Sequence, residues 1–125
     1  MIMPMTILLP QERILSGRDE GKKVRDKIHL DEFDRNKEPH ICVLLSIITY
    51  SINASFFIGC FLDSIDHLGS RRNFEEKYKF FGDQKYFSIM LEDGINRCES
   101  ILKTRRNENV TTNDATNKLS RYFYI

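Results

Sequence analysis

The chain has 125 residues and a mass of 14.8 kDa, which fits one compact domain and excludes a multidomain machine. An apolar fraction of 41% and a charged fraction of 30% are ordinary for a globular protein and exclude wholesale disorder. Because 19 Lys and Arg residues nearly balance 18 Asp and Glu residues, the net charge of +1 gives no global reason to bind nucleic acid or an acidic membrane.

The N-terminus and the cysteines favour a cytoplasmic protein. The first ten residues contain two prolines and no basic residue ahead of their apolar stretch, so the pattern of a secretory signal peptide is missing. Polar residues interrupt the longest apolar region, 41–62, which makes it a poor membrane span. The three cysteines, Cys42, Cys60 and Cys98, lie far apart in apolar surroundings, a pattern that favours free buried thiols in a reducing compartment.

The N-terminal half of the chain predicts strands around one charged helix. Met5–Leu9 is a short apolar run closed by a proline, and Ile14-Leu15 predicts a second short strand before a turn. Gly21–Asn36 is highly charged but has apolar residues near helical spacing, so we expect one amphipathic helix there. Ile41–Ile48 is apolar at both parities, which predicts a central strand that is buried on both faces.

The pattern changes after the polar turn Tyr50–Asn53. Apolar residues at helical spacing from Phe57 to Leu68 predict a helix that Gly69 ends. Phe74–Phe81 predicts a strand, and we expect a further helix from Asp83 or Gln84 to about Thr104.

The order of these elements predicts an α/β fold. Strands that alternate with helices favour βαβ units, with a mixed or parallel sheet of about four strands flanked by about three helices. We expect residues 1–104 to form the single domain and residues 105–125 to form a polar, mobile tail. The tail ends in the aromatic run Tyr122–Ile125, which we expect to dock on this chain or on a partner.

Several groups of residues could suggest a phosphate, metal or catalytic site, but their spacing is better explained by turns and solvent-exposed helix faces. Gly17–Lys23 has two glycines and three basic residues before a helix, but it lacks the spacing of a phosphate-binding loop, so a turn is favoured over an anion site. The histidines His29, His40 and His67 are scattered over three elements, and Asp63 and Asp66 fit a solvated helix face. We therefore expect no enzyme activity, no cofactor and no metal.

Basic residues leave one alternative function open. Lys22, Lys23, Arg71 and Arg72 form two small clusters, and further basic residues stand at Arg105-Arg106. A small nucleic-acid-binding domain could use them, and its binding would depend strongly on salt.

The most informative stretch runs from Ile41 to Gly69. A hydrophobic strand leads to a turn with the step Ser55-Phe56, then to a helix that closes with Leu68-Gly69. This stretch, together with the glycine-containing entry to a helix at Ser16–Val24, resembles the STAS domains of sulfate transporters and anti-sigma-factor antagonists. It is more similar to the bacterial STAS-like group, a domain family of unknown function, and the resemblance covers residues 16–102.

The resemblance implies a bacterial or phage regulatory adaptor that docks to a protein, with an ATPase of the histidine-kinase type as the partner class. In the antagonists, phosphorylation of a Ser or Thr before the central helix switches docking, and the matching residue is Ser55, with Ser51 nearby. This chain departs from that pattern at Asn53, where Asp is usual, and at Phe56, where Gly is usual. A structural role for Ser55 as the helix N-cap is the alternative.

A docking surface is expected at this turn. It comprises Tyr50, Ser51, Asn53, Ser55, Phe56 and Phe57. Adjacent helix positions point in different directions, so we expect one of the two phenylalanines to be exposed for partner contact.

Overall fold

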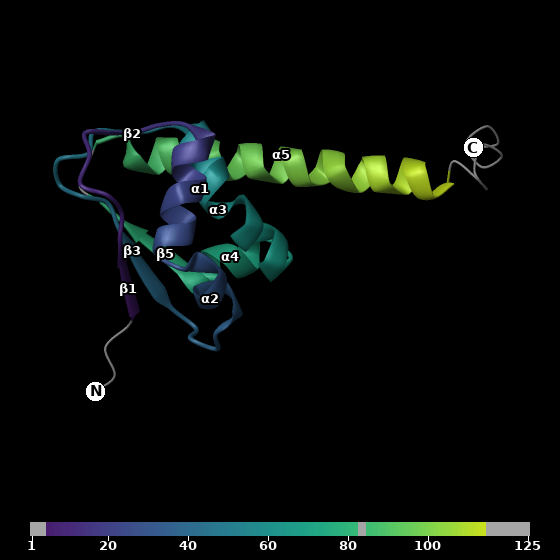
Figure 1. The fold of residues 1–125 in the computed structure, drawn as a ribbon, viewed down its shortest axis with the longest axis horizontal. Coiled ribbons are helices and arrows are strands. Elements are labelled where there is room, and N and C mark those ends of the chain that lie inside the picture. The colour runs from purple at the N-terminus through teal and green to yellow at the C-terminus, as the bar shows by residue number, and fades with distance from the viewer. Residues whose placement is uncertain (1–4, 83–84, 115–125) are drawn as a thin grey trace.

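The computed structural model describes residues 5–82 and 85–114, and it is an α/β domain with one long projecting helix (Figure 1). The main sheet has three parallel strands in the order β1-β3-β5, and a small parallel pair, β2 and β4, lies beside it. The strands are β1 (Met5–Leu8), β2 (Ile14–Leu15), β3 (Ile41–Leu44), β4 (Ser51–Ile52) and β5 (Tyr78–Phe81). The helices are α1 (Arg18–Lys27), α2 (Leu30–Arg35), α3 (Ala54–Leu68), α4 (Arg71–Lys77) and α5 (Phe87–Asp114).

The central position of β3 is confirmed, but the expectation of burial on both faces is wrong. Ile41 and Val43 are fully buried under the helices, whereas Cys42 and Leu44 on the opposite face are only half-buried. The strand also ends four residues earlier than expected, because the chain turns at Ser46, whose carbonyl accepts a hydrogen bond from the Thr49 N–H. Ile47 and Ile48 therefore lie in an exposed turn.

The expected helix over Gly21–Asn36 is in fact two helices. His29 separates α1 from α2 with φ 58° and ψ 48°, a left-handed conformation that interrupts helical hydrogen bonding. The apolar spacing of the segment is compatible with either arrangement, so periodicity alone does not reveal the break.

The helix α3 lies at the centre of the fold, and its end at Gly69 is confirmed, since Gly69 adopts the left-handed C-terminal conformation at φ 90°. Two glycines let α1 cross α3 with their backbones in contact. A Cβ atom on Gly59 would meet the Arg18 carbonyl oxygen, and one on Gly21 would meet the Phe56 carbonyl oxygen. This close crossing fixes the start of α3 against the segment that follows β2.

The C-terminal elements differ from expectation in their bounds. The segment predicted as one strand, Phe74–Phe81, contains the end of α4 and then β5. The last helix begins at Phe87 and continues to Asp114, ten residues beyond the expected end at Thr104. Residues 115–125, including the aromatic run Tyr122–Ile125, lie outside the described residues, as do Asp83 and Gln84.

Candidate docking surface

The start of α3 is held by Asn53. Its side-chain oxygen accepts a hydrogen bond from the Phe56 N–H at 2.9 Å, which is the geometry of a helix N-cap. Its side-chain amide donates to Ser16 Oγ at 2.7 Å, and its backbone N–H donates to the Leu15 carbonyl at 3.0 Å. Asn53 is therefore the N-cap and ties α3 to β2, so the alternative role of Ser55 as N-cap is wrong.

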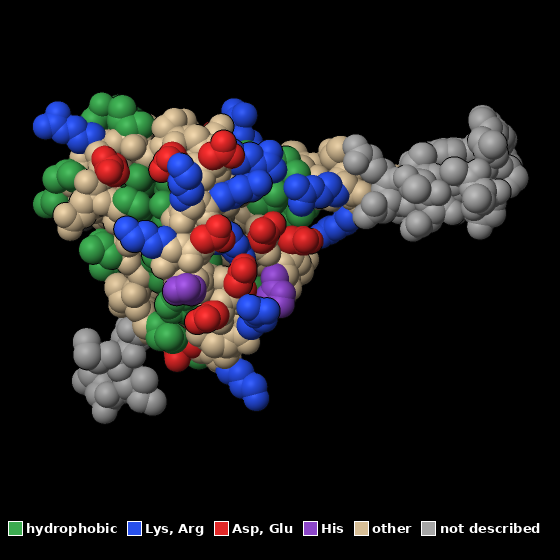
Figure 2. All heavy atoms as spheres, viewed as in Figure 1, with side chains coloured by type: hydrophobic (Ala, Val, Ile, Leu, Met, Phe, Trp, Pro, Cys, Tyr) green, Lys and Arg blue, Asp and Glu red, His purple; other side chains and the backbone are tan. Residues whose placement is uncertain are grey.

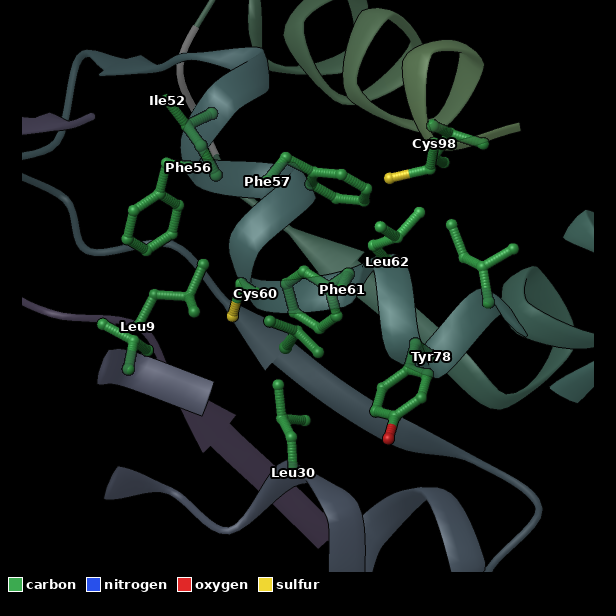
Figure 3. Close-up of a cluster of buried hydrophobic side chains, with 14 of the residues drawn as sticks. Leu9, Leu30, Ile52, Phe56, Phe57, Cys60, Phe61, Leu62, Tyr78 and Cys98 are labelled. Carbon is green, nitrogen blue, oxygen red and sulfur yellow. The ribbon is translucent and has the colours of Figure 1, made fainter. Parts of the chain in front are cut away.

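Both phenylalanines at the start of α3 are buried, and the expectation that one of them is exposed is wrong. Phe56 and Phe57 are each 1% exposed. Figure 3 shows that they point to opposite sides of α3, Phe56 toward Leu9 and Phe57 toward Cys98 on α5. Adjacent positions can both be buried here because other elements cover α3 on more than one side.

Phe57 joins an aromatic cluster that α3 shares with α4 and β5. Its ring centroid lies 5.1 Å from that of Phe61 and 6.0 Å from that of Phe80. A Cβ atom on Gly94 would meet the Phe57 ring, so α5 closes over this side without space for a side chain at that position. Phe57 is therefore part of the core.

The remaining predicted site residues are divided between surface and interior. Tyr50 is 62% exposed, and Asn53 and Ser55 are exposed at the start of α3. Ser51 is half-buried in β4, where it pairs with Ile14. Four of the six residues thus remain accessible around the loop that precedes α3.

Exposed apolar side chains gather around this same loop. Among the described residues nine large hydrophobic side chains are exposed, and eight of them lie near the carboxyl ends of the strands. We call these eight residues the apolar rim: Leu8, Ile14, Ile47, Ile48, Tyr50, Phe81, Tyr86 and Ile89. In Figure 2, hydrophobic side chains gather along the edge of the body where β2 and the neighbouring loops lie in Figure 1.

Hydrogen bonds between loops bring the parts of the rim together. The Leu45 N–H donates to the Phe81 carbonyl, the Leu9 N–H donates to the Leu44 carbonyl, and the Tyr50 N–H donates to the Arg13 carbonyl. Leu8, Leu44 and Phe81 also share one row across the open face of the main sheet. The rim is therefore a continuous structural edge built from three separate parts of the chain.

Sequence reasoning found only Tyr50 of these eight residues. Ile47 is 86% exposed although it belongs to the apolar run that predicts a buried strand. The length of the apolar run Ile41–Ile48 was a signal of this surface. The run is longer than β3, so its last residues, Ile47 and Ile48, lie beyond the strand and are exposed.

A hollow of about 430 Å³ adjoins the rim beside the start of α3. Leu15, Val24 and Phe56 contribute apolar surface, and Lys23 and Lys27 stand among the lining side chains of α1. Ile14 lines the hollow and belongs to the rim, so the two features are continuous.

A buried polar network lies at the other end of the strands. The guanidinium of Arg25 donates to Asp34 at 2.5 Å, to Asp31 at 2.6 Å and to Ser64 Oγ at 2.9 Å. The Tyr78 hydroxyl donates to the second oxygen of Asp34 at 2.5 Å. Arg25 and Asp34 are about 5% and 4% exposed, so this network links α1, α2, α3 and β5 inside the protein.

The network shifts the ionisation of its members. Burial, with the hydrogen bond to Asp34, raises the pKa of Tyr78 well above its ordinary value of 10. Burial opposes the charge on Arg25, but its bonds to Asp34 and Asp31 outweigh that effect and raise its pKa. Every strong donor of the network therefore keeps its proton, and the arrangement suits stability.

The basic clusters of the alternative function are largely paired with acids. Arg71 forms ion pairs with Glu75, Glu92 and Glu99, and the bonds to Glu92 and Glu75 raise its pKa. Arg72 pairs with Glu76 at 3.2 Å and Lys23 pairs with Glu20 at 3.3 Å. This pairing reduces the positive potential that nucleic-acid binding would need.

Among the described residues, the His, Cys, Asp and Glu side chains do not come together in a metal site, because no three of them are placed to hold a metal ion. Cys42, Cys60 and Cys98 are free thiols, and burial raises the pKa of Cys60 and of Cys98 to about 12. None of the described helices combines the length and apolarity needed to cross a bilayer.

Comparisons of the chain with protein-family models, with curated proteins and with solved structures find no match.

Proposed function

We propose that this protein is a non-enzymatic regulatory adaptor that docks to another protein through the apolar rim and the start of α3. The observation that carries the proposal is that, within residues 5–82 and 85–114, eight of the nine exposed large hydrophobic side chains lie at one edge. An apolar surface in contact with water is unfavourable, and such patches on folded domains commonly mark interaction sites.

The structure supports a mode of docking as well as a place. Ile47 and Tyr50 project from the rim as apolar anchors, and the adjoining hollow can accept an apolar side chain of the partner over Phe56. Two lysines and two glutamates line the hollow and Lys23 pairs with Glu20, so apolar contact with Phe56 supports docking there more than charge does.

The resemblance to STAS-like domains adds a partner class and a switch to the proposal. The partner would be an ATPase of the histidine-kinase type, and Ser55 would be the residue at which added negative charge changes docking. Ser55 is exposed in the first turn of α3, five residues after the rim residue Tyr50. A charge there is tolerated by the helix dipole but disfavoured in an interface.

The test compares two matched substitutions of exposed apolar residues. Ile47→Ser changes a residue of the rim. Met5→Ser changes an exposed residue at the amino end of β1, away from the rim. A protein captured from cell extract is purified, and its affinity for each variant is measured by calorimetry. We expect Ile47→Ser to weaken binding about tenfold or more and Met5→Ser to change it by less than about twofold.

Two outcomes would overturn the proposal: equal affinities of the two variants, or capture of nucleic acid alone with strong salt dependence. Ser55→Asp and Ser55→Ala then test the switch with the same purified partner. The aspartate should weaken binding and the alanine should not, because only the former adds charge to the interface.

A further inference from the structure

The helix α5 extends far beyond the body of the domain. The rim residue Tyr86 precedes it and Ile89 lies in its first turn, and among the α5 side chains described, up to residue 107, the last buried one is Leu102. From there to Asp114 it projects by roughly 18 Å, at 1.5 Å per residue (Figure 1). The described side chains after Leu102 are exposed, and a polar helix without packing is only marginally stable in water.

The sequence after α5 is apolar enough to cover a surface such as the rim. Residues 115–125 include Leu119 and the run Tyr122-Phe123-Tyr124-Ile125. Within one chain the distance is unfavourable, since Ile89 and Asp114 are separated by roughly 38 Å along α5. Tyr124, ten residues later, reaches at most about 36 Å when fully stretched, which leaves no length for packing across the rim.

The charges along α5 favour a second copy in the opposite direction. Glu92 and Asp93 are exposed near its start, and Lys103, Arg105 and Arg106 are exposed in its second half. Glu92 already pairs with the half-buried Arg71, whereas the pair of Asp93 with Arg97 is exposed, and an exposed pair is weak and leaves room for a further cation. Two antiparallel copies of α5 would place the basic half of each beside the acidic half of the other.

The antiparallel arrangement can also bring residues 119–125 of each copy to the rim of the other. If Arg106 of one copy lies opposite Glu92 of the other, Asp114 lies level with the start of the second copy's α5, beside Tyr86. In this register residues 119–125 come after Asp114 close to the apolar rim of the second copy.

We propose that two copies of this chain associate with their α5 helices antiparallel, and that residues 119–125 of each copy cover the apolar rim of the other. The contact is reciprocal, as two-fold symmetry requires. It uses the same rim as the proposed docking function but does not depend on another protein. Self-association and partner docking would then compete for one surface.

The experiment measures the mass of the full chain by sedimentation over a concentration series. We expect a species of twice the 14.8 kDa chain mass that dissociates on dilution. A variant with Tyr122→Ser, Phe123→Ser and Tyr124→Ser should remain a monomer at the same concentrations, and so should a rim variant with Ile47→Ser and Ile48→Ser. Met5→Ser is the matched control and should associate like the unchanged chain.

Mixing the two monomeric variants gives the sharpest result. One keeps its rim and the other keeps its aromatic segment, so the mixture should form a heterodimer through one of the two contacts. A monomeric unchanged chain, a dimer that survives the aromatic substitutions, or a mixture that stays monomeric would each overturn the proposal. None of these results would alter the affinity test with a separate partner.

Discussion

The two ends of the strands show opposite arrangements of polar and apolar groups. At the amino ends, Arg25 and Asp34 are charged yet buried, and hydrogen bonds satisfy them. At the carboxyl ends, Ile47 and Tyr50 are apolar yet exposed, and nothing among the described residues covers them. The first arrangement is closed and links the helices to the sheet, whereas the second is open, and we propose that binding completes it.

The largest effect should come from breaking the closed end. Asp34→Ala leaves Arg25 and the Tyr78 hydroxyl without their shared buried acceptor, so the free energy of unfolding should fall by about 3–5 kcal/mol. Asp31→Ala is the matched control, because this carboxylate binds the same guanidinium but its side chain is 65% exposed. Its cost should be below about 1 kcal/mol. Equal losses in urea unfolding would contradict the difference drawn between the two carboxylates.

The buried thiols should make stability depend on alkaline pH. The folded protein holds the pKa of Cys60 at about 12, above its ordinary value of 9, so the unfolded chain ionises first as pH rises. The stability due to this raised pKa is complete below about pH 9 and is lost as pH rises toward 12, by at most about 1.4 kcal/mol per pH unit. In Cys60→Ala this part of the pH dependence should disappear.

Urea unfolding at several values between pH 8 and pH 10.5 measures this slope. Leu62→Ala is the control, because it opens the same buried helix without removing a thiol. The groups Tyr78 and Lys77 are present in every variant and cancel in the comparison. An unchanged slope in Cys60→Ala would show that the thiol is not protected from ionisation.

A smaller effect should come from the helix start that borders the rim. Asn53→Ala removes the side-chain acceptor of the Phe56 N–H and should cost about 1 kcal/mol in thermal or urea unfolding. Ser55→Ala should cost less than about 0.5 kcal/mol, since Ser55 is exposed and is not the N-cap. The reverse order of the two losses would restore Ser55 as the cap.

The smallest effect on folding should come from the open end itself. Ile47→Ser and Tyr50→Ser should change the free energy of unfolding by less than about 0.5 kcal/mol, because both side chains are mostly in solvent. A loss above about 2 kcal/mol, comparable to a core truncation, would mean that these side chains belong to the folded core.

Sequence patterns predicted the parts of the fold that depend on local periodicity. The strand β1, the end of α3 at Gly69 and the central position of β3 follow from short apolar runs and a helix-ending glycine. The break at His29 was not predictable, because a left-handed residue between two helices leaves the apolar spacing intact. The burial of both Phe56 and Phe57 depends on helices that pack from two sides, which is tertiary information.

The candidate site was predicted in part for the same reason. The loop before α3 was chosen from its turn residues and from the resemblance, and the structure shows that Tyr50 and Ser55 are exposed there, while their role in docking stays a prediction. The rest of the rim comes from β1, β2, the turn after β3, β5 and the start of α5, and the parallel pairing of the strands helps to bring these parts together. The buried pair of Arg25 and Asp34 was missed because both residues are typical of an exposed helix face.

Site-specific photo-crosslinking in living cells would show whether the apolar rim is a docking surface. A photoreactive amino acid replaces Tyr50 on the rim in one strain and His67, exposed near the end of α3, in another. We expect discrete crosslinked adducts from position 50, with a second copy or with another protein, and none of these from position 67. Adducts of equal yield and identity from both positions, or none from position 50, would contradict a docking surface at the apolar rim.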